Sequence, residues 1–104
     1  MSTEFYPLTI SKVERQTADS VAVNFTVPDE LKEKFKYIQG QHLTLKADLN
    51  GQDIRRSYSI CKGIDSQDLQ VGIKAIEEGI FSNYANSELK AGMTIEVMPP
   101  QGHF

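Results

Sequence analysis

The segment Arg56-Ser57-Tyr58-Ser59 carries side chains that could bind a ligand with an anionic part and a flat ring. On a β-strand Arg56 and Tyr58 point to the same face, roughly 7 Å apart, because successive side chains alternate between faces. A guanidinium pairs with phosphate, and a phenol ring stacks on a ring system. Ser59 adds a hydroxyl and a nearby backbone N–H for polar ring atoms. The alternative is an ordinary pair of surface side chains.

A second candidate segment, Gly79 to Tyr84, places a glycine, a hydroxyl and backbone N–H groups at the expected start of a helix. Such a start attracts anions, because its N–H groups lack partners and the helix dipole is positive there. The expected first turn, Asn83 to Asn86, has no Asp or Glu, and an external anion would explain that absence. The alternative is that Ser82 serves only as an N-cap.

Between these segments lies the expected strand Val71-Gly72-Ile73-Lys74. Lys74 could add a positive charge near the same anion, or it could lie in solvent on the outward face. Gly72 in the middle of a strand indicates either the close approach of a backbone or ligand, or a bulge.

The composition restricts the function further. The 104 residues fit one domain, and the net charge of −3 argues against nucleic acid as a partner. Cys61 is alone, so it forms no internal disulfide, and the two histidines show no metal-ligand spacing. No apolar run is long enough for a membrane span, and the first residues do not resemble a signal peptide. We therefore expect a cytoplasmic protein without a metal site.

Alternating apolar and polar residues predict six short strands, which is typical of a closed barrel or a sandwich. The expected strands are Leu8–Val13, Val21–Val27, Leu43–Leu49, Gln52–Ile60, Leu69–Ala75 and Ile95–Val97. Asn50-Gly51 predicts a hairpin turn. Start and stop signals predict two helices, one at Pro28–Phe35 and one at Ser82–Lys90, the second closed by Gly92.

Four motifs occur in order along the chain: Gly40-Gln41, Arg56-x-Tyr58-Ser59, Gly79-x-x-Ser82 and Pro100-Gln101-Gly102-His103-Phe104. In this order and spacing they resemble the flavin-binding domain of the ferredoxin-NADP reductase superfamily. Within it, the runs around Gly40, Tyr58 and Pro100 look most like the reductase subunits of phenylacetyl-CoA epoxidase systems, which serve phenylacetate degradation. The resemblance implies an all-β fold, a six-stranded antiparallel Greek-key barrel with one short α-helix near the C-terminal end.

The same resemblance implies FAD as cofactor, with FMN less expected, and gives residue roles. Arg56 and Ser82 would hold the pyrophosphate, and Tyr58 would stack on the isoalloxazine ring. Ser59 would bond near the flavin N5, the atom that exchanges hydride. Val71 and Lys74 correspond to a strand along the ribityl chain and the phosphates. The expected cofactor-binding set is completed by neighbours in the same segments: Ser57, Ile60, Ile73, Gly79 and Phe81.

The family places a nicotinamide-binding domain after the Pro-x-Gly-x-Phe segment, and the resembling subtype adds a plant-type [2Fe-2S] domain. Residues 1–104 contain no GxGxxG and one cysteine, so they encode neither. We therefore interpret the chain as the truncated N-terminal FAD-binding domain of an NAD(P)H-dependent reductase, inactive alone, whose parent passes electrons to an oxygenase component.

Two alternatives remain. The parent could be the reductase of another oxygenase or a flavohaemoglobin-like protein, with FMN as a further option for the cofactor. Outside this class, the chain could be a nucleotide- or oligonucleotide-binding barrel without redox function, although the acidic charge argues against the oligonucleotide version. A scaffold domain would leave the Arg56, Tyr58 and Ser82 features unexplained.

Overall fold

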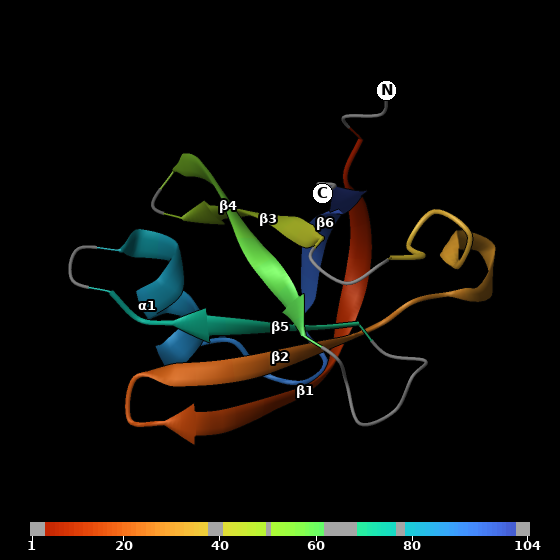
Figure 1. Cartoon of the computed structure of the whole chain (residues 1–104). Helices are drawn as coiled ribbons and strands as arrows, with labels where there is room; N and C mark the ends of the chain where they lie inside the picture. The colour runs from red at the N-terminus through yellow and green to blue at the C-terminus, as the bar shows by residue number, and fades with distance from the viewer. Residues whose placement is uncertain (1–3, 38–40, 50, 62–68, 77–78, 102–104) are drawn as a thin grey trace.

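A computed structural model describes residues 4–37, 41–49, 51–61, 69–76 and 79–101. Six antiparallel strands and one α-helix make up the fold in these residues (Figure 1). The elements are β1 (Tyr6–Thr17), β2 (Ser20–Thr26), a 3₁₀ turn η1 (Asp29–Leu31), β3 (His42–Leu49), β4 (Gln52–Cys61), β5 (Leu69–Lys74), α1 (Ile80–Ser87) and β6 (Thr94–Gln101).

The strands close into a barrel in the order β1-β2-β5-β4-β3-β6. Strands β3, β4 and β5 follow one another, while β2 lies beside β5, which is Greek-key topology. The barrel closes because β1 pairs with two neighbours, with β6 through its first part and with β2 through the rest. The expected fold is confirmed.

The core is filled by the inward side chains of every strand. Leu8, Val23, Phe25, Leu45 and Val97 have no exposed surface. The alternation that predicted β2 as a half-buried strand is only partly right, because Ala22 and Asn24 on its other face are buried too. Asn24 is covered from the adjacent strand, where Gln70 Nε2 donates to Asn24 Oδ1 over 3.1 Å.

The predicted hairpin between β3 and β4 is confirmed, with Leu49 opposite Gln52. Gly51 takes a φ of +77°, a conformation that favours glycine. Asn50 lies outside the described residues, as do Gly40 and the Gly102-His103-Phe104 end of the last motif. The described helix α1 is too short to cross a membrane.

Both predicted helices differ from the structure. Only Asp29–Leu31 forms a helical turn where Pro28–Phe35 was expected, and Phe35 instead inserts its ring into the core. Helix α1 begins at Ile80 rather than Ser82 and ends at Ser87 rather than Lys90. Gly79 is its N-cap, because Asn83 N–H already bonds the Gly79 carbonyl over 3.0 Å. Gly92, at φ +95°, belongs to the turn before β6.

Candidate functional site

A groove opens where β4 and β5 separate. These strands pair only through Ile60 with Val71 and Cys61 with Gln70 among the described residues, and beyond that point α1 lies against both of them (Figure 1). The groove has a volume of about 500 Å³. It is lined by Arg56, Ser57, Tyr58, Ser59, Cys61, Gly72, Lys74, Ile76, Gly79, Phe81 and Ser82.

The structure thus brings the Arg-x-Tyr-Ser strand and the Gly-x-x-Ser helix start to one groove. Of the predicted site residues, only Ile60, Val71 and Ile73 do not line it. Val71 and Ile73 are fully buried in the core, and Ile60 packs against that core. Contact between these three and a groove ligand would therefore involve backbone atoms.

Three residues outside the predicted set also line the groove: Cys61, Gly72 and Ile76. Gly72 carried a signal, a glycine inside a strand pattern. Among the described residues, a Cβ at that position would meet only Cys61 Sγ, at 3.6 Å, so these residues leave room there. Ile76 carried a weaker signal, an apolar residue just past the end of a strand, and it is 60% exposed.

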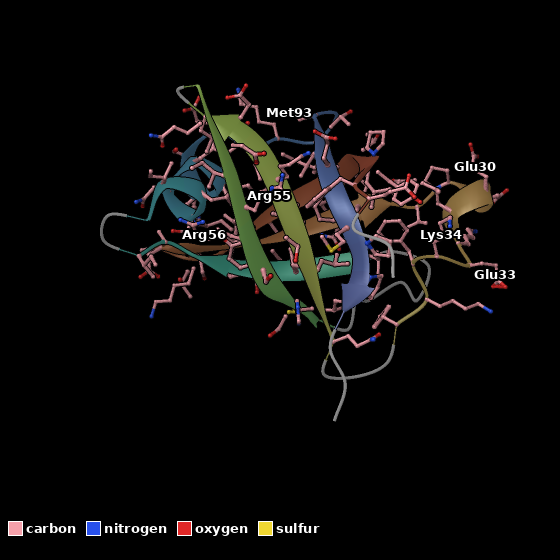
Figure 2. All side chains as sticks on the ribbon, turned by 90° about the horizontal axis from the view of Figure 1, so that it is seen from above. Glu30, Glu33, Lys34, Arg55, Arg56 and Met93 are labelled. Atoms are coloured by element: carbon pink, nitrogen blue, oxygen red, sulfur yellow. The ribbon has the colours of Figure 1, made fainter. Side chains whose placement is uncertain are left out.

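The two adjacent arginines of β4 differ in their partners. Arg55 binds Asp53 through two contacts of 3.0 and 3.2 Å, and this pairing lowers the pKa of Asp53. Arg56 Nη1 donates to the Arg55 carbonyl over 2.7 Å, and no carboxylate of the described residues forms an ion pair with it. Figure 2 shows Arg56 on the side of β4 toward α1 and Arg55 on the side toward β3. Arg56 therefore brings a positive charge to the groove that no described carboxylate neutralises.

Lys74 lies across the groove on β5 and is exposed. It too has no ion pair with a described carboxylate. Since the whole chain carries a net charge of −3, two cations in one groove without a counter-ion among the described residues indicate a site for an anion.

The aromatic wall is formed by Tyr58 resting on Phe81. Tyr58 is half-buried, and burial raises the pKa of its hydroxyl, while the charge of Arg56 partly lowers it. Phe81 also makes an edge contact with Tyr84, with ring centroids 6.2 Å apart. The Tyr58 ring is thus held by a packed core and presents its remaining surface to the groove.

The start of α1 supplies backbone donors. Its first turn has no acidic residue, and no described acceptor bonds the N–H groups of Ile80, Phe81 and Ser82. The Ser82 hydroxyl is buried and accepts from Ile76 N–H over 3.2 Å, so it connects Ile76 to the first turn of the helix. The donors that the helix start offers to a ligand are therefore backbone N–H groups, because the Ser82 hydroxyl is bonded within the protein to Ile76 N–H and the Gly79 carbonyl.

The two serines of β4 lie on the exposed side of the strand. Ser57 Oγ and Thr44 Oγ1 on β3 share a hydrogen bond of 2.9 Å. The Ser59 side chain is exposed and makes no hydrogen bond within the described part of the chain, so its hydroxyl is available to a ligand.

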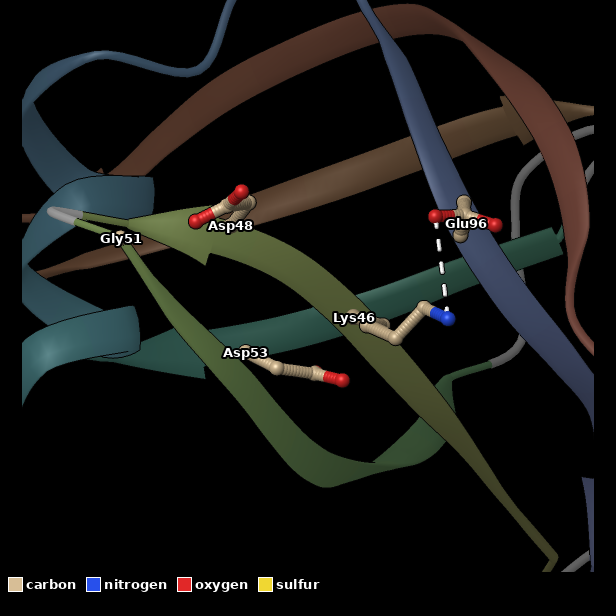
Figure 3. A pocket seen from close by; sticks show the side chains of 5 residues that line it. All are labelled: Lys46, Asp48, Gly51, Asp53 and Glu96. Atoms are coloured by element: carbon tan, nitrogen blue, oxygen red, sulfur yellow. Dashed lines mark ion pairs between the residues drawn. The ribbon is translucent and has the colours of Figure 1, made fainter.

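A second hollow of about 300 Å³ lies near the β3–β4 hairpin and is lined by Lys46, Asp48, Gly51, Asp53 and Glu96 (Figure 3). Lys46 pairs with Glu96 over 3.8 Å, and Asp53 is occupied by Arg55. Carboxylates outnumber the one ammonium, so this hollow repels phosphate.

The larger groove fits a flavin nucleotide by its donor set. It combines an aromatic wall at Tyr58, cations at Arg56 and Lys74, and the first N–H groups of α1, which have no partner among the residues that the structure describes; these groups suit a flat ring joined to phosphates. The barrel and the groove together define a domain that binds a nucleotide with a planar ring.

Comparison with known proteins agrees. Residues 7–104 match the model of the oxidoreductase FAD-binding domain, and the chain belongs to this family. It is 50% identical over 102 residues to a component of the 1,2-phenylacetyl-CoA epoxidase of Escherichia coli K12, an alignment that covers 98% of this chain and 29% of that protein. It is 40% identical over 100 residues to the ferredoxin reductase component of 3-ketosteroid-9-alpha-monooxygenase of Rhodococcus rhodochrous, covering 93% of this chain and 28% of that one.

Solved structures share the fold. A ferredoxin NADP⁺ reductase of Neisseria gonorrhoeae with bound FAD and NADP superposes with a TM-score of 0.80 at 19% identity, covering 98% of this chain and 40% of that one. A phthalate dioxygenase reductase, a modular protein for electron transfer from pyridine nucleotides to [2Fe-2S], gives a TM-score of 0.70 at 24% identity, covering 96% and 30%.

Proposed function

We propose that the groove between β4, β5 and α1 holds FAD. Arg56 binds the pyrophosphate together with the first-turn N–H groups of α1, and Lys74 lies along the phosphates. Tyr58 stacks on the isoalloxazine ring, and Ser59 donates to its polar edge. The observation that carries this proposal is the contrast within one arginine pair: Arg55 is neutralised by Asp53, while Arg56 faces the groove without a carboxylate from the described residues.

The bound flavin would supply the redox chemistry, which is the acceptance of a hydride and the release of single electrons. The residues of this chain orient the ring and neutralise the phosphates. None of them needs to act as a general acid or base.

The chain spans about three-tenths of the length of the curated relatives that it matches. We infer that it is the flavin module of a longer NAD(P)H-dependent reductase, with a nicotinamide-binding domain and a [2Fe-2S] domain elsewhere in the parent. The relative of 50% identity favours an acceptor of the phenylacetyl-CoA epoxidase type. The steroid monooxygenase relative supports the alternative, the reductase of another oxygenase.

Titration of the chain with FAD, followed by flavin fluorescence, tests the cofactor proposal. Arg56→Ala should weaken FAD binding roughly 10- to 150-fold, because a charge-assisted hydrogen bond contributes about 1.5–3 kcal/mol. Arg55→Ala is the matched control and should leave FAD affinity unchanged. Equal effects of the two substitutions would refute the phosphate role of Arg56. The FAD-loaded chain alone should not oxidise NADPH, and brisk turnover would contradict the proposed division between domains.

A further inference from the structure

The C-terminal turn of α1 is tied to the barrel by one residue pair from opposite ends of the chain. Arg15, on β1, donates from Nη1 to Asn86 Oδ1 over 3.0 Å and from Nη2 to the Asn86 carbonyl over 2.5 Å. The two donors of the Arg15 guanidinium thus bind both the side chain and the backbone of Asn86. A helix carbonyl near the C-terminus, which lacks an intrahelical partner, is thereby satisfied by a cation.

Asn86 continues the connection into the sheet. Its Nδ2 donates to the Ile73 carbonyl on β5 over 3.1 Å and to the Ser82 carbonyl in α1 over 2.9 Å. The β4–β5 ladder does not extend to Ile73. Asn86 thus bonds a carbonyl of β5 at the place where the strand has separated from β4, and it does so from the same helix whose other end lines the groove.

Arg15 lies beside a bulge in β1, which helps to direct its side chain toward Asn86. The register of β1 against β2 shifts between Arg15 and Thr17, and such bulges redirect side chains. Arg15 Nη1 also lies 3.4 Å from the Ala18 carbonyl in the hairpin turn. Figure 1 shows the end of this hairpin beside α1.

We propose that Arg15 and Asn86 form a brace that positions the first turn of α1 for the phosphates of FAD. Arg15 is a positioning residue, since it lines neither the groove nor the aromatic wall. The proposal rests on the FAD function inferred above. In this proposal, recognition of the phosphates depends on a contact at the C-terminal end of α1. That contact lies about one helix length from the N-terminal N–H groups that would bind the phosphates.

Arg15→Ala tests the brace, with Lys12→Ala as matched control. Lys12 is another exposed cation of β1, and its ion pair is with Glu14 on the same strand. Arg15→Ala should increase amide hydrogen exchange in residues 80–87 of the flavin-free chain while β2 and β3 keep their protection. It should weaken FAD binding on the order of tenfold, because two hydrogen bonds to α1 are lost. Riboflavin, which has no phosphate, should bind as before, and Arg15→Lys should recover part of the FAD affinity.

Asn86→Ala provides the second variant. It should weaken FAD binding at least as much as Arg15→Ala, and the double substitution should add little to Asn86→Ala alone, because both remove one brace. Unchanged exchange in α1, or equal losses for FAD and riboflavin, would overturn the brace. Failure of the unsubstituted chain to bind FAD would instead refute the cofactor proposal, which the exchange measurement does not depend on.

Discussion

The ring of Phe81 packs against the ring of Tyr58, with centroids 5.9 Å apart and planes tilted by 40°. Phe81 belongs to the helix start and Tyr58 to β4, so one contact joins the two walls of the groove. Phe81 is fully buried, whereas Tyr58 is half-buried. The buried ring of Phe81 supports the half-buried ring of Tyr58, and the orientation of Tyr58 is therefore set by core packing.

Tyr58→Ala should weaken the binding of riboflavin and FAD alike, by roughly 2- to 12-fold, because an aromatic pair contributes about 0.5–1.5 kcal/mol. Tyr58→Phe keeps the ring and should bind both ligands nearly as the unsubstituted chain does. Fluorescence titration with each flavin measures this. A loss restricted to FAD would show that Tyr58 does not contact the ring.

Gly79→Ala should disturb the helix start. A Cβ there would lie 2.5 Å from both Ile76 Cγ1 and Ser82 Oγ, so these side chains must move away. We expect destabilisation of about 1–3 kcal/mol, together with weaker FAD binding. Gly51→Ala is the control: it strains a positive φ in the β3–β4 hairpin, away from the groove, at a cost of about 1–2 kcal/mol. Chemical denaturation should show losses for both variants, and only Gly79→Ala should lose FAD affinity.

Gly72→Val should have opposite effects on stability and binding. Its Cβ makes an ordinary contact with Cys61, and valine suits a strand better than glycine does. The denaturation midpoint should therefore stay level or rise, while the side chain enters the groove and FAD affinity falls. Unchanged FAD affinity would place the cofactor away from β5.

The raised pKa of Tyr58 predicts a pH effect on stability. Below about pH 10, the ordinary tyrosine pKa, both the folded and unfolded forms keep this proton, so Tyr58 contributes no pH dependence. Above it, the unfolded chain releases the proton first, so stability should fall as the pH rises through the folded-state pKa. Alkaline denaturation of Tyr58→Phe should be less steep. Arg56→Ala should raise the Tyr58 pKa further, which absorbance titration of the phenol can detect.

The strands could be predicted because their signals are local. Leu43 and Leu45 alternate with polar neighbours, and Gly51 marks the hairpin. The helix start could not be placed correctly, because Ser82 is a good N-cap by composition but is used three residues into the helix, where it bonds Ile76 N–H. The Pro28–Phe35 segment carries a helix start signal, yet only Asp29–Leu31 forms a 3₁₀ turn, and Phe35 is buried in the core.

Most of the residues that line the groove could be predicted from the Arg-x-Tyr-Ser and Gly-x-x-Ser motifs. That these two motifs lie beside the same groove depends on the pairing of the barrel strands, which no local sequence signal encodes. In the described residues β4 pairs with β5 at Ile60 and Cys61 and is separate from it at the residues before Ile60, and this is a property of register in the closed barrel. The contact between Arg15 and Asn86 joins residues 71 positions apart and has no motif at all.

The short ladder between β4 and β5, with two residue pairs in the described part of the chain, has a consequence for exchange of the ligand. Since the strands are already parted where the groove lies, a ligand can enter or leave without breaking a strand pairing. We therefore expect the release of a ligand from the groove and the unfolding of the barrel to be separate events.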